Sequence, residues 1–172
     1  MKHNCVKRYL IPAGICVLVI LGILYYYFFS AMLHSGSATQ YVYIDNDDNI
    51  DSVYAKLEPI CASQALNGFR TLTRHSSYDE HVKSGRYAIK PGQGAFVVFR
   101  HLKNGMQEPV NLTIPSVRTL ERLSAEVCKR LMMDSTQLLK ALRDPKICAR
   151  YGYDTATIQC MFIPNTYDIY WN

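Results

Sequence analysis

Acid–base chemistry in this sequence could come from five glutamates, namely Glu58, Glu80, Glu108, Glu121 and Glu126. A carboxyl group acts as a general acid or base when it is held next to the reacting atoms. Each of these glutamates lies on a predicted helix or loop beside basic residues, which is typical of a solvated surface with salt bridges. The sequence also contains no glycine-rich phosphate loop and no nucleophile elbow. The residues alone therefore define no catalytic constellation.

Neither the histidines nor the cysteines beyond the N-terminal part of the chain have the spacing of metal ligands. The histidines beyond the N-terminal tail form no HxxxH or HxH pair; they are His34, His75, His81 and His101. The sequence thus predicts no metal site and no cofactor. The cysteines beyond the apolar N-terminal stretch also lack metal-ligand spacing; they are Cys61, Cys128, Cys148 and Cys160. Several of them lie in apolar patterns, and both buried free thiols and disulfides stay open for them.

The chain is organised around an apolar stretch from Leu10 to Phe29 that contains no charged residue. At about 1.5 Å per residue, a helix of this length crosses the roughly 30 Å hydrocarbon layer of a bilayer once. Three basic residues precede the stretch, whereas no Lys or Arg follows it until Lys56. Positive charge is retained in the cytoplasm, so we expect a single pass through the cytoplasmic (inner) membrane, with the N-terminus inside and the bulk of the chain on the outer, periplasmic side. A cleaved signal peptide is the alternative, which the length and the aromatic end of the stretch disfavour.

The part of the chain outside the membrane is nearly neutral. Of 19 Lys and Arg, three precede the apolar stretch, and the others are almost balanced by 14 Asp and Glu. The basic residues are not clustered on one segment. This distribution excludes the electrostatic pattern of a nucleic-acid-binding protein, so we expect no nucleic acid among the partners.

Short strands and amphipathic helices alternate after residue 40, which predicts an α+β fold of small strand–turn–helix units. Strands are predicted over 41–44, 110–114 and 157–164, and a further short strand runs into the turn at Pro91 and Gly92. Helices are predicted over 50–57, 62–74, 95–102, 115–131 and 134–142. An Asp or Asn within 45–49 should cap the first of these helices, and Asn104-Gly105 should end the third.

Five features of the sequence follow one another in a recognisable order. They are an uncleaved anchor, YVYIDNDDNIDSVYAKL, SGRYAIKPGQGAFVVFRHLKNG, VNLTIPSVRTLERLSAEV and MFIPNTYDIYW. This series resembles the YceG-like family of endolytic murein transglycosylases. In that family a membrane helix precedes a LysM-like module with a G-x-Y…PG turn and a helix that ends in Gly. A T-I-P strand and a helix follow, and an F-x-P-x-T-Y element opens the catalytic domain. The matching residues are Gly85, Tyr87, Pro91, Gly92, Gly105, Thr113, Ile114, Pro115, Phe162, Pro164, Thr166 and Tyr167.

The resemblance implies a lyase that acts on peptidoglycan and takes part in cell wall biogenesis. Such an enzyme cleaves the MurNAc–GlcNAc bond inside glycan strands without water and leaves a 1,6-anhydro-MurNAc end. One glutamate serves the family as general acid, and it is expected beyond Asn172, so no catalytic residue is assigned within this chain. Gly94 departs from the family, which commonly has Ser or Thr at that place to cap the LysM-like helix.

The resemblance also implies an order of domains. Residues 1–9 are expected as a cytoplasmic tail, 10–29 as the transmembrane anchor and 30–40 as a linker. Residues 41–108 would form an outer module with a LysM-like segment at 85–105, and 109–172 the start of a YceG-like catalytic domain. Because the last predicted strand has no partner after it, the sequence predicts a truncated protein or a fragment.

Glycan strands of peptidoglycan and the membrane are the expected partners, and peptidoglycan synthases are candidate protein partners. Sugar rings are bound by aromatic faces together with hydrogen-bonding groups. The residues predicted to contact glycan are Tyr87, Lys90, Gly92, Phe162, Pro164, Thr166 and Tyr167. For Tyr87 a place in the core of its strand stays open as well. The alternative function is that of a membrane-tethered peptidoglycan-binding or envelope scaffold module without activity.

Overall fold

A computed structural model describes residues 3–36 and 38–172, so Lys2 of the expected cytoplasmic tail and position 37 of the expected linker lie outside the described residues. Helices and short strands alternate along the chain, which confirms the predicted α+β class. The chain divides into two units. The first contains the described residues of Met1–Val42, Asp47–Lys83 and Tyr87–Met106, and the second contains Tyr43–Asn46, Ser84–Arg86 and Gln107–Asn172.

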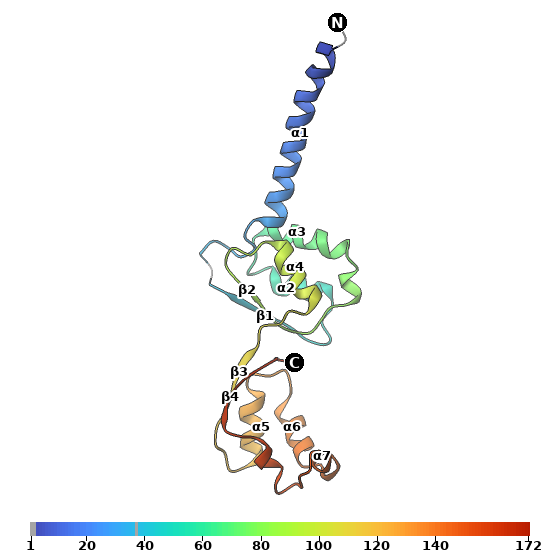
Figure 1. The fold of residues 1–172 in the computed structure, drawn as a ribbon. Helices are drawn as coiled ribbons and strands as arrows, with labels where there is room; N and C mark the ends of the chain where they lie inside the picture. The colour runs from blue at the N-terminus through green and yellow to red at the C-terminus, as the bar shows by residue number, and fades with distance from the viewer. Residues whose placement is uncertain (1–2, 37) are drawn as a thin grey trace. The chain divides into compact units, whose positions relative to one another are not determined.

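A long N-terminal helix, α1 (His3–Phe29), opens the first unit (Figure 1). Its window Pro12–Phe29 has 18 residues, is long and apolar enough to cross a membrane, and is not buried by the rest of the chain. The apolar stretch predicted a helix that begins near Leu10. The helix in fact begins at His3, so Pro12 lies inside it. A proline at an interior position removes one backbone hydrogen bond of the helix.

The rest of the first unit packs helices beside a two-stranded sheet. It contains Gln40–Val42 of β1 (Gln40–Ile44), α2 (Ile50–Leu57), α3 (Ser63–Arg74), the 3-10 turn η1 (Tyr78–Glu80), Tyr87–Ile89 of β2 (Gly85–Ile89) and α4 (Ala95–Asn104). Strands β1 and β2 pair with each other. The aromatic ring of Phe99 lies 6.3 Å from that of Phe69 and 6.2 Å from that of Tyr78, centroid to centroid. These buried rings join α3, η1 and α4 in one core.

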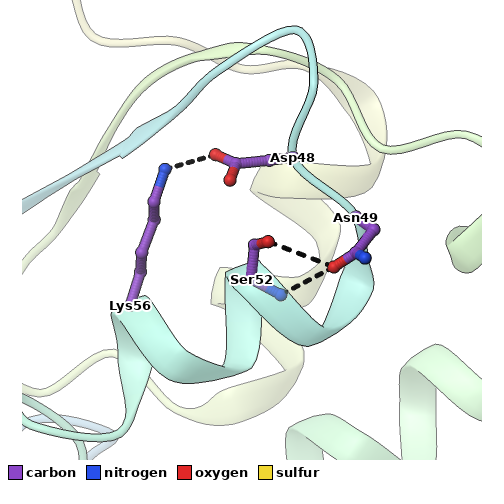
Figure 2. Close-up of polar contacts among 4 residues, drawn as sticks. All are labelled: Asp48, Asn49, Ser52 and Lys56. Atoms are coloured by element: carbon purple, nitrogen blue, oxygen red, sulfur yellow. Dashed lines mark hydrogen bonds and ion pairs between the residues drawn. The ribbon is translucent and has the colours of Figure 1, made fainter.

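Side chains and glycine conformation fix the ends of these helices as the sequence predicted. The side-chain oxygen of Asn49 accepts hydrogen bonds from the backbone N–H of Ser52 (2.9 Å) and from its hydroxyl (3.1 Å), which caps α2. Figure 2 shows this cap and the neighbouring ion pair between Asp48 and Lys56. Helix α4 ends at Gly105, whose φ of 70° lies in the left-handed region that glycine adopts without strain.

The chain that leaves α1 is held by backbone pairing. The N–H of Met32 donates to the carbonyl of Gln93 (2.7 Å), and the carbonyl of Met32 accepts from the N–H of Ala62 (2.8 Å). Ala31 and Leu33 form isolated bridges with Gly94 and Cys61, and the side chains of Met32 and Leu33 are buried. Residues 31–33 of the expected linker are thus part of the packed first unit.

The second unit is built on one antiparallel strand pair. Its elements are β3 (Val110–Ile114), α5 (Leu120–Cys128), α6 (Ser135–Leu142), α7 (Pro145–Arg150), the 3-10 turn η2 (Ile158–Met161) and β4 (Asn165–Ile169). Strands β3 and β4 pair with Leu112 opposite Tyr167. The buried side chains of β3, α5, α6, α7 and η2 form one cluster, composed of Leu112, Ile114, Leu123, Val127, Leu142, Cys148 and Ile158.

Two local predictions in the second unit were wrong, and one helix was not predicted. The helix expected from Pro115 begins at Leu120, because Thr119 caps it by accepting a hydrogen bond from the N–H of Arg122 (3.3 Å). Asp144 and Pro145 end α6 as expected, but they also start the unpredicted helix α7. The strand expected over 157–164 is largely the turn η2, and the strand itself lies at Asn165–Ile169.

Candidate functional site

The turn between β2 and α4 is the first candidate for ligand binding. The backbone N–H of Lys90 donates to the side-chain oxygen of Gln93 (2.9 Å), and the N–H of Gln93 donates to the carbonyl of Lys90 (3.2 Å). Pro91 fixes one φ in the turn, and Gly92 supplies a φ of 81°, as a type II turn requires. Lys90, Pro91 and Gly92 are exposed. The turn is therefore closed, well defined and open to a ligand.

Tyr87 does not belong to this exposed surface. Its side chain is 1% exposed and packs in the core of the first unit, and its hydroxyl donates to the carbonyl of Lys83 (3.0 Å). Burial raises the pKa of the Tyr87 hydroxyl to about 12. The expectation that Tyr87 contacts glycan is thus corrected, because the alternation of β2 turns this ring inward and leaves no face for a sugar.

Gly94 departs from the family pattern for a steric reason. It is the N-cap residue of α4, and no side-chain hydrogen bond caps the helix there. A Cβ atom at Gly94 would lie 2.8 Å from both the carbonyl oxygen of Phe28 and the Cα of Phe29. These are backbone atoms, which cannot move aside as a flexible side chain does. The side chain of a capping Ser or Thr at this position would therefore clash with the end of α1. Helix α4 begins without a side-chain cap and packs closely on α1.

The second candidate region joins two motifs that are far apart in the sequence. The T-I-P strand β3 pairs with β4, which carries the end of the F-x-P-x-T-Y element, so that Thr113 lies opposite Thr166. Their hydroxyl oxygens are 3.0 Å apart on the exposed face of the pair. The hydroxyl of Tyr167 donates to the carbonyl of Ile163 (2.9 Å), which closes the bend that leads into β4. Pro164, within this bend, is exposed.

An apolar groove of about 320 Å³ lies on the other face of this strand pair. It is lined by Leu112, Ile114, Val127, Leu131, Met161, Phe162, Ile163, Tyr167 and Ile169. Phe162 and Tyr167 are half-buried against the neighbouring core cluster. The lining supplies apolar contacts and no carboxylate. Of the residues predicted to contact glycan, those in 162–167 gather at this strand pair, whereas Lys90 and Gly92 belong to the turn of the first unit.

A comparison with models of protein families shows to which family the chain belongs. The YceG-like family model matches residues 42–172, which include both the turn and the strand pair. The chain belongs to the YceG-like family. This match confirms the resemblance that the ordered motifs indicated. No curated protein sequence matches the YceG-like chain.

The solved structure of a YceG-like protein from Listeria monocytogenes is similar to the YceG-like chain, with 16% sequence identity and a TM-score of 0.41. The similarity covers 78% of this chain and 48% of the Listeria protein. The chain thus spans about half the length of that relative.

The glutamates of the YceG-like chain lie on its surface or near it. Glu121 pairs with Arg143, and Glu126 pairs with Lys129 (2.7 Å). Glu58 and Glu80 are exposed, and Glu108 is half-buried. Within residues 12–36, 38–78 and 80–172, none of the glutamates lines the apolar groove, and no cluster of His, Cys, Asp or Glu could hold a metal ion. Surface ion pairs of this kind stabilise a protein little.

Two features of the YceG-like chain were missed by sequence reasoning. Gly68 lies in the middle of α3, and a Cβ atom there would be 2.3 Å from the carbonyl oxygen of Tyr27. A glycine inside a helical pattern often marks such a close approach, so this signal was available. The apolar pair Met32-Leu33 inside the expected linker was the other available signal, since exposed linkers are usually polar.

Proposed function

We propose that this chain is the membrane-anchored N-terminal part of a peptidoglycan lytic transglycosylase. The observation that carries the proposal is the YceG-like family match over residues 42–172. The chain would contribute the anchor, the LysM-like module and the first strands of the catalytic domain.

In the proposed reaction, the glutamic acid donates its proton to the oxygen of the MurNAc–GlcNAc bond, and this oxygen leaves as a hydroxyl. The 6-hydroxyl oxygen of the same MurNAc residue forms the new bond to C1 and passes its proton to the carboxylate, which restores the acid. No water is consumed, and the strand ends in 1,6-anhydro-MurNAc. One carboxylate suffices because the nucleophile belongs to the sugar, unlike in hydrolases that use two carboxylates.

We further propose that α1 spans the cytoplasmic membrane with its N-terminus inside. The apolar window Pro12–Phe29 and the basic residues before it support this orientation. A reporter that is active only in the cytoplasm, fused after Asn172, should be silent. A strong reporter signal would contradict the proposed orientation.

The catalytic proposal is tested by incubating peptidoglycan with two purified proteins and measuring the released anhydro-muropeptides by mass spectrometry. One protein is the 172-residue chain, and the other is the chain extended through the proposed catalytic glutamate. We expect release by the extended protein and none by the 172 residues alone. Failure of the extended protein would overturn the proposed activity, whereas release by the short chain would place the catalytic residue within it.

A tethered peptidoglycan-binding module without activity is the second candidate function. The exposed, closed turn around Lys90 and Gly92 favours it, because such a turn offers hydrogen-bonding groups without catalytic ones. The full chain in detergent should sediment with insoluble peptidoglycan, and Lys90→Ala should weaken this binding. Lys140→Ala, at an exposed position of α6, is the matched control and should leave it unchanged. Equal binding by the unchanged chain, Lys90→Ala and Lys140→Ala would show that Lys90 does not contribute to glycan binding.

A further inference from the structure

The end of α1 is fixed to the helices that follow it. Gly68 in the middle of α3 and Gly94 at the start of α4 lie so close to the backbone of residues 27–29 that neither position has room for a Cβ atom. The bridge between Ala31 and Gly94 begins two residues after the helix ends. In Figure 1, α3 lies across the end of α1. Helices α3 and α4 are therefore packed directly against the end of α1.

Apolar side chains remain exposed at this junction. Phe96, in the first turn of α4, is 41% exposed, and its ring centroid lies 6.1 Å from that of Phe29 at the end of α1. Leu72 follows Gly68 by one helical turn on the same face of α3 and is only half-buried. The apolar surface of the membrane helix thus continues onto both helices that contact its end.

The charge of these helices has one sign. The sequences of α3 and α4 contain four basic residues, Arg70, Arg74, Arg100 and Lys103, and no Asp or Glu. Arg100 is exposed and lies one turn after Phe96, on the same face of α4. An aromatic side chain next to a basic one is the composition that binds at the boundary between acyl chains and anionic headgroups. Arg100 is long enough to reach headgroups while Phe96 lies deeper.

We propose that Leu72, Phe96 and Arg100, here called the collar, dock on the outer surface of a bilayer that contains anionic lipid. The inference rests on the proposed insertion of α1, because that insertion brings the collar to the bilayer surface. Continuity with α1 and the basic charge of α3 and α4 select a lipid surface as the occupant. The docked collar holds the turn at Lys90 beside the membrane, because the carbonyl of Gln93 in that turn bonds to Met32. Glycan that emerges from the membrane would meet the turn there.

The test uses tryptophan fluorescence in the full chain reconstituted into vesicles that contain two brominated lipids. An anionic lipid carries bromine near the acyl-chain carbonyls, and a second lipid carries bromine near the ends of its acyl chains, at the depth of position 20 in the middle of the apolar window. Trp171→Phe removes the one native tryptophan, and single tryptophans are then introduced by Phe96→Trp, Asn104→Trp or Ile20→Trp. Asn104 is the matched control, because it is exposed at the opposite end of the same helix, about 12 Å further along its axis. We expect the probes at positions 96 and 20 to lose emission to the bromines and the probe at position 104 to keep it.

The outcomes separate the collar from the anchor. Quenching at position 20 without quenching at position 96 would overturn the docking and leave the membrane anchor intact. Equal quenching at positions 96 and 104 would overturn the docking geometry, and no quenching at position 20 would overturn both docking and anchor. As a second measurement, Arg100→Glu should reduce the quenching at position 96 in anionic vesicles, whereas the control Lys140→Glu should not. An unchanged signal in Arg100→Glu would overturn the role of charge in the docking.

Discussion

The substitution Gly68→Ala tests the contact between α1 and α3, because the contact decides whether the substitution raises or lowers the stability of the protein. Alanine is a better helix former than glycine, so Gly68→Ala alone should stabilise α3 by about 1 kcal/mol. The new Cβ would, however, lie 2.3 Å from the carbonyl oxygen of Tyr27, well inside normal contact distance. Forcing an extra carbon into packed backbone costs roughly 1–3 kcal/mol. The steric cost exceeds the gain, and we expect a net loss of about 1 kcal/mol.

Asn67→Ala is the matched control for this substitution. Asn67 precedes Gly68 in the same helix, and its side chain is exposed, so alanine brings the gain in helix propensity without the clash. Thermal unfolding of the full chain in detergent, followed by circular dichroism, should show a lower Tm for Gly68→Ala, by about 4–8 °C per kcal/mol for a unit of this size. Asn67→Ala should show an equal or slightly higher Tm. If Gly68→Ala raised the Tm as well, the end of α1 would not be docked on α3.

Three further predictions concern buried or hydrogen-bonded groups outside α1. In denaturant titrations, Tyr87→Ala should lower the free energy of unfolding by about 3–5 kcal/mol, because the ring fills the core. Tyr87→Phe should lower it by about 1 kcal/mol, because only the hydrogen bond of the hydroxyl is lost. Equal losses in the two variants would show that the ring contributes nothing beyond this hydrogen bond. The Thr157 hydroxyl and backbone N–H groups of Thr157 and Ala156 lower the pKa of Asp154. This carboxylate therefore stabilises its turn above about pH 4 and loses that effect as the pH falls through the lowered pKa. The protection factor of the Thr157 amide, which corrects hydrogen exchange for the pH dependence of the intrinsic rate, should fall in acid, and Asp154→Asn should abolish this dependence. Burial raises the pKa of Cys61 to about 12, so maleimide should label exposed Cys160 in the folded chain and leave Cys61 unlabelled until denaturant is added.

Elements set by local signals could be predicted from the sequence. The cap at Asn49 and the glycine stop at Gly105 depend on residues within one turn, and both lie where the pattern placed them. The turn η2 shows the opposite case. Its letters favour a strand, but the Asp154 side chain binds the N–H groups of Ala156 and Thr157 and starts a turn instead. A β-propensity pattern does not reveal such a competing hydrogen bond.

The candidate site was predictable in part for the same reason. The Pro-Gly turn is local, and its exposed residues Lys90 and Gly92 lie where the motif placed them. The burial of Tyr87 depends on which face of β2 meets the core, and alternation in a short strand does not decide the face. The partner of Gly94 lies more than sixty residues earlier, at the end of α1. Contacts of this range follow from packing and not from spacing.

The pairing of β3 with β4 has a consequence for biosynthesis. Thr113 and Thr166 lie opposite each other but are 53 positions apart, so the strand pair encloses nearly the whole second unit. A nascent chain can complete the first unit once α4 has left the ribosome, whereas β3 must wait for β4. During that interval β3 has an open edge and apolar side chains on one face, which is the condition that favours pairing with strands of other chains. Conditions that slow translation between α4 and β4 should therefore promote aggregation through the second unit.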